Sequence, residues 1–162
     1  MKRILCFLLI FALLFSAGCS RRQSKPEGTP FYYCVAEPAY GNGSTSISRE
    51  YRSDVPEDSL MAAFELYLAG PESAEMISPF PEGMKILSAV QEGDTVLLTV
   101  SMELTALTGL DLTMACGCLT MTSLALTDAK QVQISPIYGL LDGQRTITMN
   151  EDTLLLLDHS KN

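Results

Sequence analysis

The chain has 162 residues, 47% of them hydrophobic, and a formal net charge of −8. This length and apolar content suit one packed domain, with or without a tether. A nucleic-acid partner would require Lys and Arg gathered on one face. The only compact basic groups, Lys2-Arg3 and Arg21-Arg22, instead flank an apolar N-terminal segment. The charge distribution therefore argues against nucleic acid as a partner.

Residues 1–18 have the order of a secretory signal peptide. A basic start at Lys2-Arg3 precedes an apolar run over residues 4–15, and the small residues Ser16-Ala17-Gly18 follow it. The run is shorter than the ~20 apolar residues that a membrane-spanning helix needs. We therefore expect this segment to be removed.

Cys19 directly follows the small residues, and Ser16-Ala17-Gly18-Cys19 resembles the bacterial lipobox. The resemblance implies cleavage between Gly18 and Cys19 and a diacylglycerol on the Cys19 thiol. The alternatives are an ordinary secretory signal with a chance cysteine, or an uncleaved anchor. Residues 19–30 are polar, with Pro and Gly, which predicts a flexible tether. The expected location is the extracytoplasmic face of the cell membrane, with the chain lipid-anchored.

The first folded elements are predicted to be a β-hairpin. Residues 31–36 are aromatic and β-prone, residues 40–44 are rich in Gly and Asn, and residues 45–52 can form the partner strand.

An amphipathic helix is predicted to follow the hairpin. Ser53-Asp54 can cap it, and Leu60, Phe64 and Leu68 repeat at one-turn spacing. Gly70-Pro71 is a stop signal for the helix.

Residues 84–90 and 95–102 read as two strands joined by a turn at residues 91–94. Residues 104–127 fit both an alternating strand and the helical stripe Leu107, Leu110, Met114, Cys118, Met121, Ala125. The length favours a helix, since strands rarely run so long.

Residues 131–134 form a short alternating strand pattern. A final hairpin is predicted from residues 143–149 and 153–157 around Asn150-Glu151-Asp152. The predicted fold class is α+β: a small mixed β-sheet with two helices packed on one face, in a βαββαβ-like order. The domain is expected to span residues 31–158, with a disordered tail at 159–162.

Several segments in this order resemble the GerMN domain, a family named for a spore-germination and sporulation protein. They are Tyr67-Leu68-Ala69-Gly70-Pro71, the loop and strand over residues 79–88, and Val96-Leu97-Leu98-Thr99-Val100-Ser101. A long helix and a strand over residues 132–134 follow, as in the family. The chain departs from it at Met114-Ala115-Cys116-Gly117-Cys118, where members usually carry Ala and Leu.

The resemblance implies a surface-anchored extracytoplasmic domain without a known active site. It also implies a fold similar to ring-building modules of secretion-type assemblies, and partner binding through sheet and helix surfaces. A role in sporulation or germination is inferred only from this resemblance.

The sequence gives little indication of a catalytic site or a metal site. The single histidine, His159, lies close to the last residue, where a catalytic imidazole would lack packing. Carboxylates lie at turns and helix starts rather than as an acid and base pair. We expect no catalytic residue, no metal site and no cofactor.

Cys34, Cys116 and Cys118 remain after Cys6 and Cys19 are assigned to the signal and the anchor. Burial in the core is the favoured hypothesis. A disulfide from Cys34 to one of the other two is the alternative in an oxidising compartment. Metal binding is disfavoured, because a C-x-C pair on a helix points to different faces.

The sequence thus predicts a non-enzymatic protein-interaction or assembly module held at the membrane by Cys19, with envelope proteins as partners. The alternative is a small-ligand-binding lipoprotein that serves a transporter or an envelope sensor. A deep pocket would favour the alternative, and an exposed sheet edge or apolar patch would favour the interaction module.

Overall fold

The structure is a computed structural model that describes residues 27–36 and 46–153. The signal segment, Cys19, the turn at 40–44, the second strand of the last predicted hairpin beyond residue 153, and His159 lie outside the described residues. The elements in chain order are β1 (Thr29–Val35), β2 (Ile47–Arg52), α2 (Leu60–Leu68), β3 (Met76–Ile77), β4 (Ile86–Glu92), β5 (Thr95–Val100), the 3₁₀ helix η1 (Met102–Ala106), α3 (Gly109–Leu126), β6 (Gln131–Pro136), β7 (Ile147–Met149) and the 3₁₀ helix η2 (Glu151–Thr153).

The strands form two sheets. One has three antiparallel strands in the order β2-β1-β3, and the other has four strands in the order β4-β5-β6-β7. In the larger sheet β5 and β6 are parallel, and the remaining pairs are antiparallel. Helix α3 connects the two parallel strands, which need a crossover of this kind because a tight turn cannot join them.

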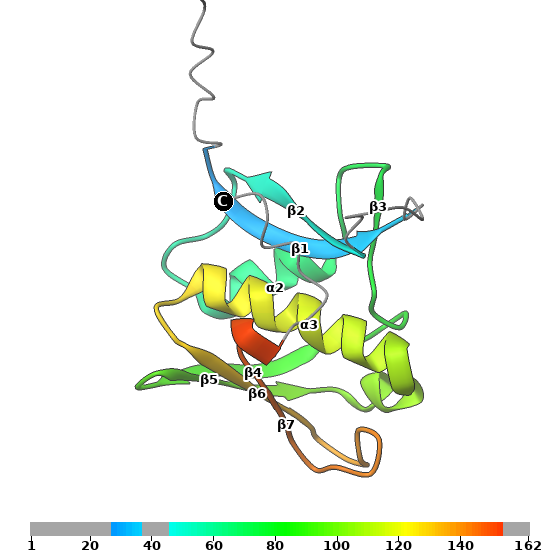
Figure 1. Cartoon of the computed structure of the whole chain (residues 1–162). Coiled ribbons are helices and arrows are strands. Elements are labelled where there is room, and N and C mark those ends of the chain that lie inside the picture. Colours follow the sequence, from blue (N-terminus) through cyan, green and yellow to red (C-terminus); the bar gives the residue numbers. More distant parts are fainter. Residues whose placement is uncertain (1–26, 37–45, 154–162) are drawn as a thin grey trace, which may run out of the picture.

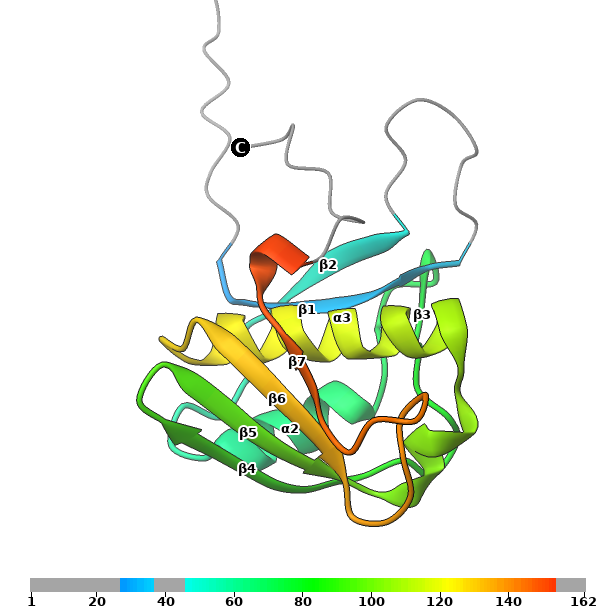
Figure 2. The ribbon, with the colours of Figure 1, turned by 60° about the horizontal axis from the view of Figure 1, so that its bottom comes forward.

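The helices lie between the two sheets. Figures 1 and 2 show β1 and β2 on one side, α2 and α3 in the middle, and the four-stranded sheet on the other side. Helix α3 contacts β1 above it and β6 and β7 below it, whereas α2 packs on β4. The predicted α+β class and the mixed sheet with two helices on one face are confirmed. The first hairpin, however, does not join that sheet, because it covers the helices from the opposite side.

Burial on both sides explains the ambiguous pattern of residues 104–127. The prediction of a helix is confirmed for residues 109–126, whereas residues 102–106 form η1 and Leu107 and Thr108 are extended. Every residue of α3 from Met114 to Ser123 is buried. A helix enclosed all round needs no single apolar stripe. Helix α3 meets the length and hydropathy of a membrane span, but 61% of it is buried inside the protein, as in a core helix.

Helix α3 also completes the hydrogen bonding of β1. Strand β3 pairs with β1 only at Cys34 and Val35, so Tyr32 has no strand partner on that side. The Tyr32 amide donates to Thr122 Oγ1 at 3.0 Å, and the Tyr32 carbonyl accepts from the Tyr67 hydroxyl at 2.7 Å. Two side chains therefore replace a neighbouring strand, because buried backbone groups require partners.

Tyr67 is the centre of an aromatic cluster that joins α2 to the three-stranded sheet. The Tyr33 hydroxyl donates to the Tyr67 carbonyl at 2.8 Å, and the Tyr67 ring lies 5.2 Å from that of Phe31 and 5.4 Å from that of Phe80. Burial raises the pKa of Tyr67 well above its ordinary value. The phenol therefore stays protonated at neutral pH and donates to Tyr32.

The predicted cap of the first helix is wrong. Ser59 caps α2, and its Oγ accepts from the Ala62 amide at 3.2 Å. Asp54 instead accepts two hydrogen bonds from the Arg52 guanidinium, at 3.0 and 2.8 Å. The buried Arg52 requires carboxylate partners, which draws Asp54 away from the helix.

The ends of the domain also differ from the predicted ones. Strand β1 begins at Thr29, so the last residues of the predicted tether pair with β2. The first strand of the predicted last hairpin is the short β7, which pairs with β6. Thr153 lies in η2, because Asn150 Oδ1 accepts its amide at 2.9 Å and closes a capped turn.

Two neighbouring threonines of α3 test the role of buried hydroxyls. Thr120 Oγ1 is buried and has no hydrogen-bond partner among the described residues, whereas Thr122 Oγ1 accepts the Tyr32 amide. We expect Thr120→Val to raise the free energy of unfolding by about 1 kcal/mol and Thr122→Val to lower it by about 1–3 kcal/mol. Denaturant unfolding of both variants measures the contrast, and equal effects would contradict it.

Candidate interaction surface

The candidate site is the loop of residues 137–146, which joins β6 to β7. It lies at the lower end of the molecule in Figures 1 and 2. Leu141 is fully buried in the main core, and its backbone exchanges hydrogen bonds of 2.8 and 2.9 Å with Gln144. The Ile137 amide donates to the Val100 carbonyl at 2.8 Å. The loop is thus fixed at its start and in its middle.

Asp142 joins this loop to the start of the central helix. Its Oδ2 accepts the Gly109 amide at 2.9 Å, and Thr108, the residue before α3, makes no side-chain cap. A carboxylate at this position interacts favourably with the positive end of the helix dipole. Asp142 adopts a φ of 46°, which Asp tolerates better than most residues.

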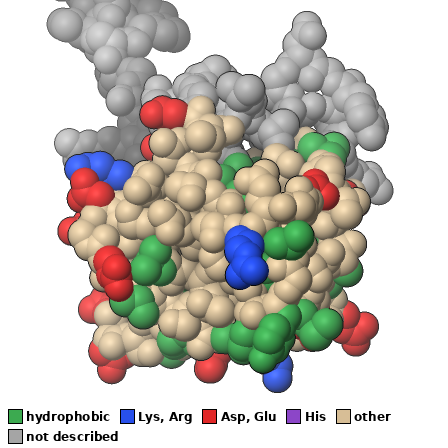
Figure 3. All heavy atoms as spheres, turned by 90° about the horizontal axis from the view of Figure 1, so that it is seen from below, with side chains coloured by type: hydrophobic (Ala, Val, Ile, Leu, Met, Phe, Trp, Pro, Cys, Tyr) green, Lys and Arg blue, Asp and Glu red, His purple; other side chains and the backbone are tan. Residues whose placement is uncertain are grey.

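The loop displays large apolar side chains on its outer side. Tyr138 is 72% exposed, and Ile137 and Leu140 are each 48% exposed. They line an open groove of about 560 Å³ together with Arg145. Figure 3 views this side of the molecule and shows hydrophobic side chains gathered at one edge, with few charged side chains between them.

Gly139 lets the loop lie close to η1. Its φ is +87°, and a Cβ at this position would come within 3.2 Å of Thr105 Cγ2. Met102, which is 59% exposed, belongs to the same 3₁₀ helix.

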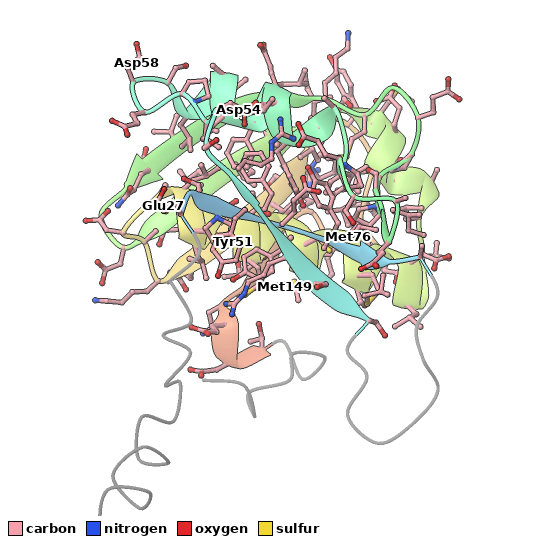
Figure 4. All side chains as sticks on the ribbon, turned by 90° about the horizontal axis from the view of Figure 1, so that it is seen from above. Glu27, Tyr51, Asp54, Asp58, Met76 and Met149 are labelled. Atoms are coloured by element: carbon pink, nitrogen blue, oxygen red, sulfur yellow. The ribbon has the colours of Figure 1, made fainter. Side chains whose placement is uncertain are left out.

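The largest charged cluster of the described residues has a structural role. Arg52 is 7% exposed and contacts the carboxylates of Glu50, Asp54 and Glu72 at 3.7, 2.8 and 3.0 Å. Glu50 also accepts the backbone amides of Glu72 and Ser73. Hydrogen bonding to Asp54 raises the pKa of Arg52, and the same bond lowers that of Asp54. These acids therefore hold β2 against the segment after α2. Figure 4 shows Asp54 and Asp58 on the connection that leaves β2.

The cysteines of the folded part lie in two separate clusters. Cys116 is fully buried in the main core, where burial raises its pKa to about 12. Cys118 is buried beside Ile47 and Met114, and the half-buried Cys34 packs against this second group. The interaction between the two thiols lowers the pKa of Cys34 and raises that of Cys118. The described residues contain no group of three or more side chains that could hold a metal ion.

The sequence patterns predicted no role for Ile137, Tyr138 or Leu140. The available signal was a run of apolar residues broken by Gly139 and ended by Asp142-Gly143, a pattern typical of a turn. The predicted cleavage and lipid-attachment residues, Gly18 and Cys19, lie outside the described residues.

The family follows from a comparison with known proteins. The family model Germane, described as sporulation and spore germination, matches residues 30–139. The chain belongs to the Germane family. The resemblance to GerMN domains is therefore confirmed, and the exposed Tyr138 lies near the end of the matched Germane region.

Two solved structures match the chain, and the first of them is similar in fold. The tandem GerMN domains of the sporulation protein GerM from Bacillus subtilis match with a TM-score of 0.54 and 15% identity, over 80% of this chain and 49% of that chain. The Germane chain thus spans about half of that tandem protein. A Clostridium perfringens protein named as a lipoprotein matches with a TM-score of 0.49 and 11% identity, over 84% of this chain and 100% of that chain. No curated protein matches.

Because Gly139 lies close to η1, we expect alanine to cost more stability at Gly139 than at Gly143 in the same loop. Gly143 has a similar positive φ of +81°, but a Cβ there would meet no atom within 4 Å. We expect Gly143→Ala to lower the free energy of unfolding by about 1 kcal/mol through backbone strain alone. Gly139→Ala should cost more, because Thr105 must also move. Chemical denaturation measures both variants, and an equal cost would show that the loop does not rest on η1.

Proposed function

We propose that the chain is a membrane-anchored extracytoplasmic lipoprotein whose Germane domain binds protein partners in the cell envelope, in sporulation or spore germination. The observation that carries the proposal is the 137–146 loop, which is fixed to the protein core and exposes apolar side chains. The family supplies the link to sporulation and germination.

The loop has the properties of a binding surface. Single exposed apolar residues are common and require no explanation, but several gathered on one rigid loop are typical of protein contacts. Tyr, Ile and Leu side chains at the centre of such a surface can fill pockets on a partner. Because the chain carries a net charge of −8, a partner with an apolar pocket and a basic rim fits best.

The positions of the start of β1 and of the 137–146 loop are compatible with a membrane anchor at the N-terminal side of the domain. The Thr29 end of β1 lies on the opposite side of the molecule from the 137–146 loop (Figure 1). A lipid on Cys19 would hold the domain from the β1 side. The loop would then point away from the membrane, toward other envelope proteins.

A role in catalysis or small-ligand binding has less support. The hollows on the described surface are open grooves, such as one of about 480 Å³ beside Arg52 and one of about 420 Å³ beside α2. Sites for small ligands usually enclose most of the ligand surface. The acids around Arg52 are engaged in ion pairs and hydrogen bonds, so none is positioned as a free general acid or base.

Site-specific photocrosslinking in intact cells tests the interaction surface. A photoreactive phenylalanine analogue at position 138 should form a discrete adduct with an envelope protein. The control is the same analogue at Ile77, an apolar residue of β3 that is 52% exposed. No adduct at position 138, or the same adduct at both positions, would contradict the proposal.

The anchor has its own test. Mass spectrometry of the protein from native membranes should find an N-terminal peptide that begins at Cys19 and carries diacylglycerol. Cys19→Ala should release the protein from the membrane fraction, because the acyl chains supply about 0.8 kcal/mol per buried CH₂. An intact, unacylated leader would contradict the anchoring without affecting the interaction surface.

A further inference from the structure

Cys34 and Cys118 are brought together from distant parts of the chain. Cys34 lies on β1 and pairs across the strands with Ile47, and Cys118 lies on the central helix. Ile47 and Cys118 belong to one buried cluster, and Cys34 packs against it. The contact therefore joins the three-stranded sheet to α3.

The backbone geometry sets this contact. The Tyr32 amide bonds to Thr122 Oγ1 at 3.0 Å, which fixes the register of the strand on the helix. Cys34 is two residues further along β1, a distance of roughly 6.6 Å. Cys118 is one turn before Thr122 on α3, a distance of roughly 6 Å. The matched spacing places the two thiols level with each other.

The three cysteines differ in accessibility and in pKa, and these differences favour a bond between Cys34 and Cys118 over one to Cys116. Cys34 is half-buried, so a reagent can reach it. The interaction with Cys118 lowers the pKa of Cys34, whereas that interaction and burial raise the pKa of Cys118. Cys116 belongs to the main core, away from Cys34, and burial keeps it protonated.

We propose that Cys34 and Cys118 are a dithiol pair that closes to a disulfide between β1 and α3, while Cys116 remains a thiol. In the first step the Cys34 thiolate attacks one sulfur of a disulfide oxidant, whose S–S bond breaks and releases one thiolate. Cys118 gives its proton to that thiolate and attacks Cys34 Sγ. The second thiolate of the oxidant then leaves and takes up the proton that Cys34 lost when it ionised. The protein loses two electrons and two protons, and the oxidant becomes two thiols.

In the cell this closure rests on the proposed extracytoplasmic location, where disulfides persist. The bond would join the sheet to the helix at the first β1 residue that pairs with β3, two residues beyond Tyr32, which has no strand on that side. It would also close a long loop of chain, which stabilises a fold mainly by restricting the unfolded state.

The test uses the full chain in detergent, with Cys6→Ser and Cys19→Ser to remove the other thiols. After treatment of the native protein with oxidised glutathione, peptide mass spectrometry should find Cys34 linked to Cys118 and Cys116 free. The melting temperature should rise by about 10 °C over that of the reduced protein. Cys116→Ser should still form the bond, and Cys118→Ser should stop at glutathione bound to Cys34.

Linkage through Cys116, or glutathione on Cys34 without closure in the chain that retains Cys118, would overturn the pairing. The same peptide analysis of acid-quenched cells separates the pairing from the location. A bond that forms in the purified protein but is absent in cells supports the pairing and counts against the extracytoplasmic location.

Discussion

The structure depends on how the edge of β1 is completed. Tyr32 presents an amide and a carbonyl on a side where no strand lies, and Thr122 and Tyr67 take the place of that strand. These two bonds set the distance between the three-stranded sheet and the helices and the register of β1 along α3. Buried backbone groups without partners would cost about 1–3 kcal/mol each, so the two side chains decide whether the upper sheet can pack on the helices.

The same central helix organises the opposite side of the molecule. The first amide of α3 bonds to Asp142, and Leu141 is buried in the core, so the 137–146 loop is held at the end of α3. The exposed Tyr138 lies on this rigid support. A protein surface on a fixed loop loses less conformational entropy on binding than a flexible one, which favours partner recognition there.

Much of the fold could be predicted from sequence because local patterns specify it. The periodicity of Leu60, Phe64 and Leu68 marks α2, and the short run over residues 95–102 marks β5. Long-range contacts decide the features that the sequence did not reveal. The ion pair of Arg52 moves the cap of α2 to Ser59, and burial between two sheets removes the apolar stripe of α3.

The candidate site was hidden for the same reason. Leu140 and Leu141 are adjacent and chemically identical, but Leu141 is fully buried and Leu140 is 48% exposed. Only the packing of the loop against the core distinguishes them. The proximity of Cys34 and Cys118 likewise follows from the register of β1 on α3. The sequence alone left both Cys116 and Cys118 as candidate partners of Cys34. Native-state hydrogen exchange of the Tyr32 amide shows whether Thr122 completes the edge of β1. We expect this amide to exchange only through global unfolding, and rapid exchange typical of an open strand edge would mean that Thr122 does not take the place of a strand.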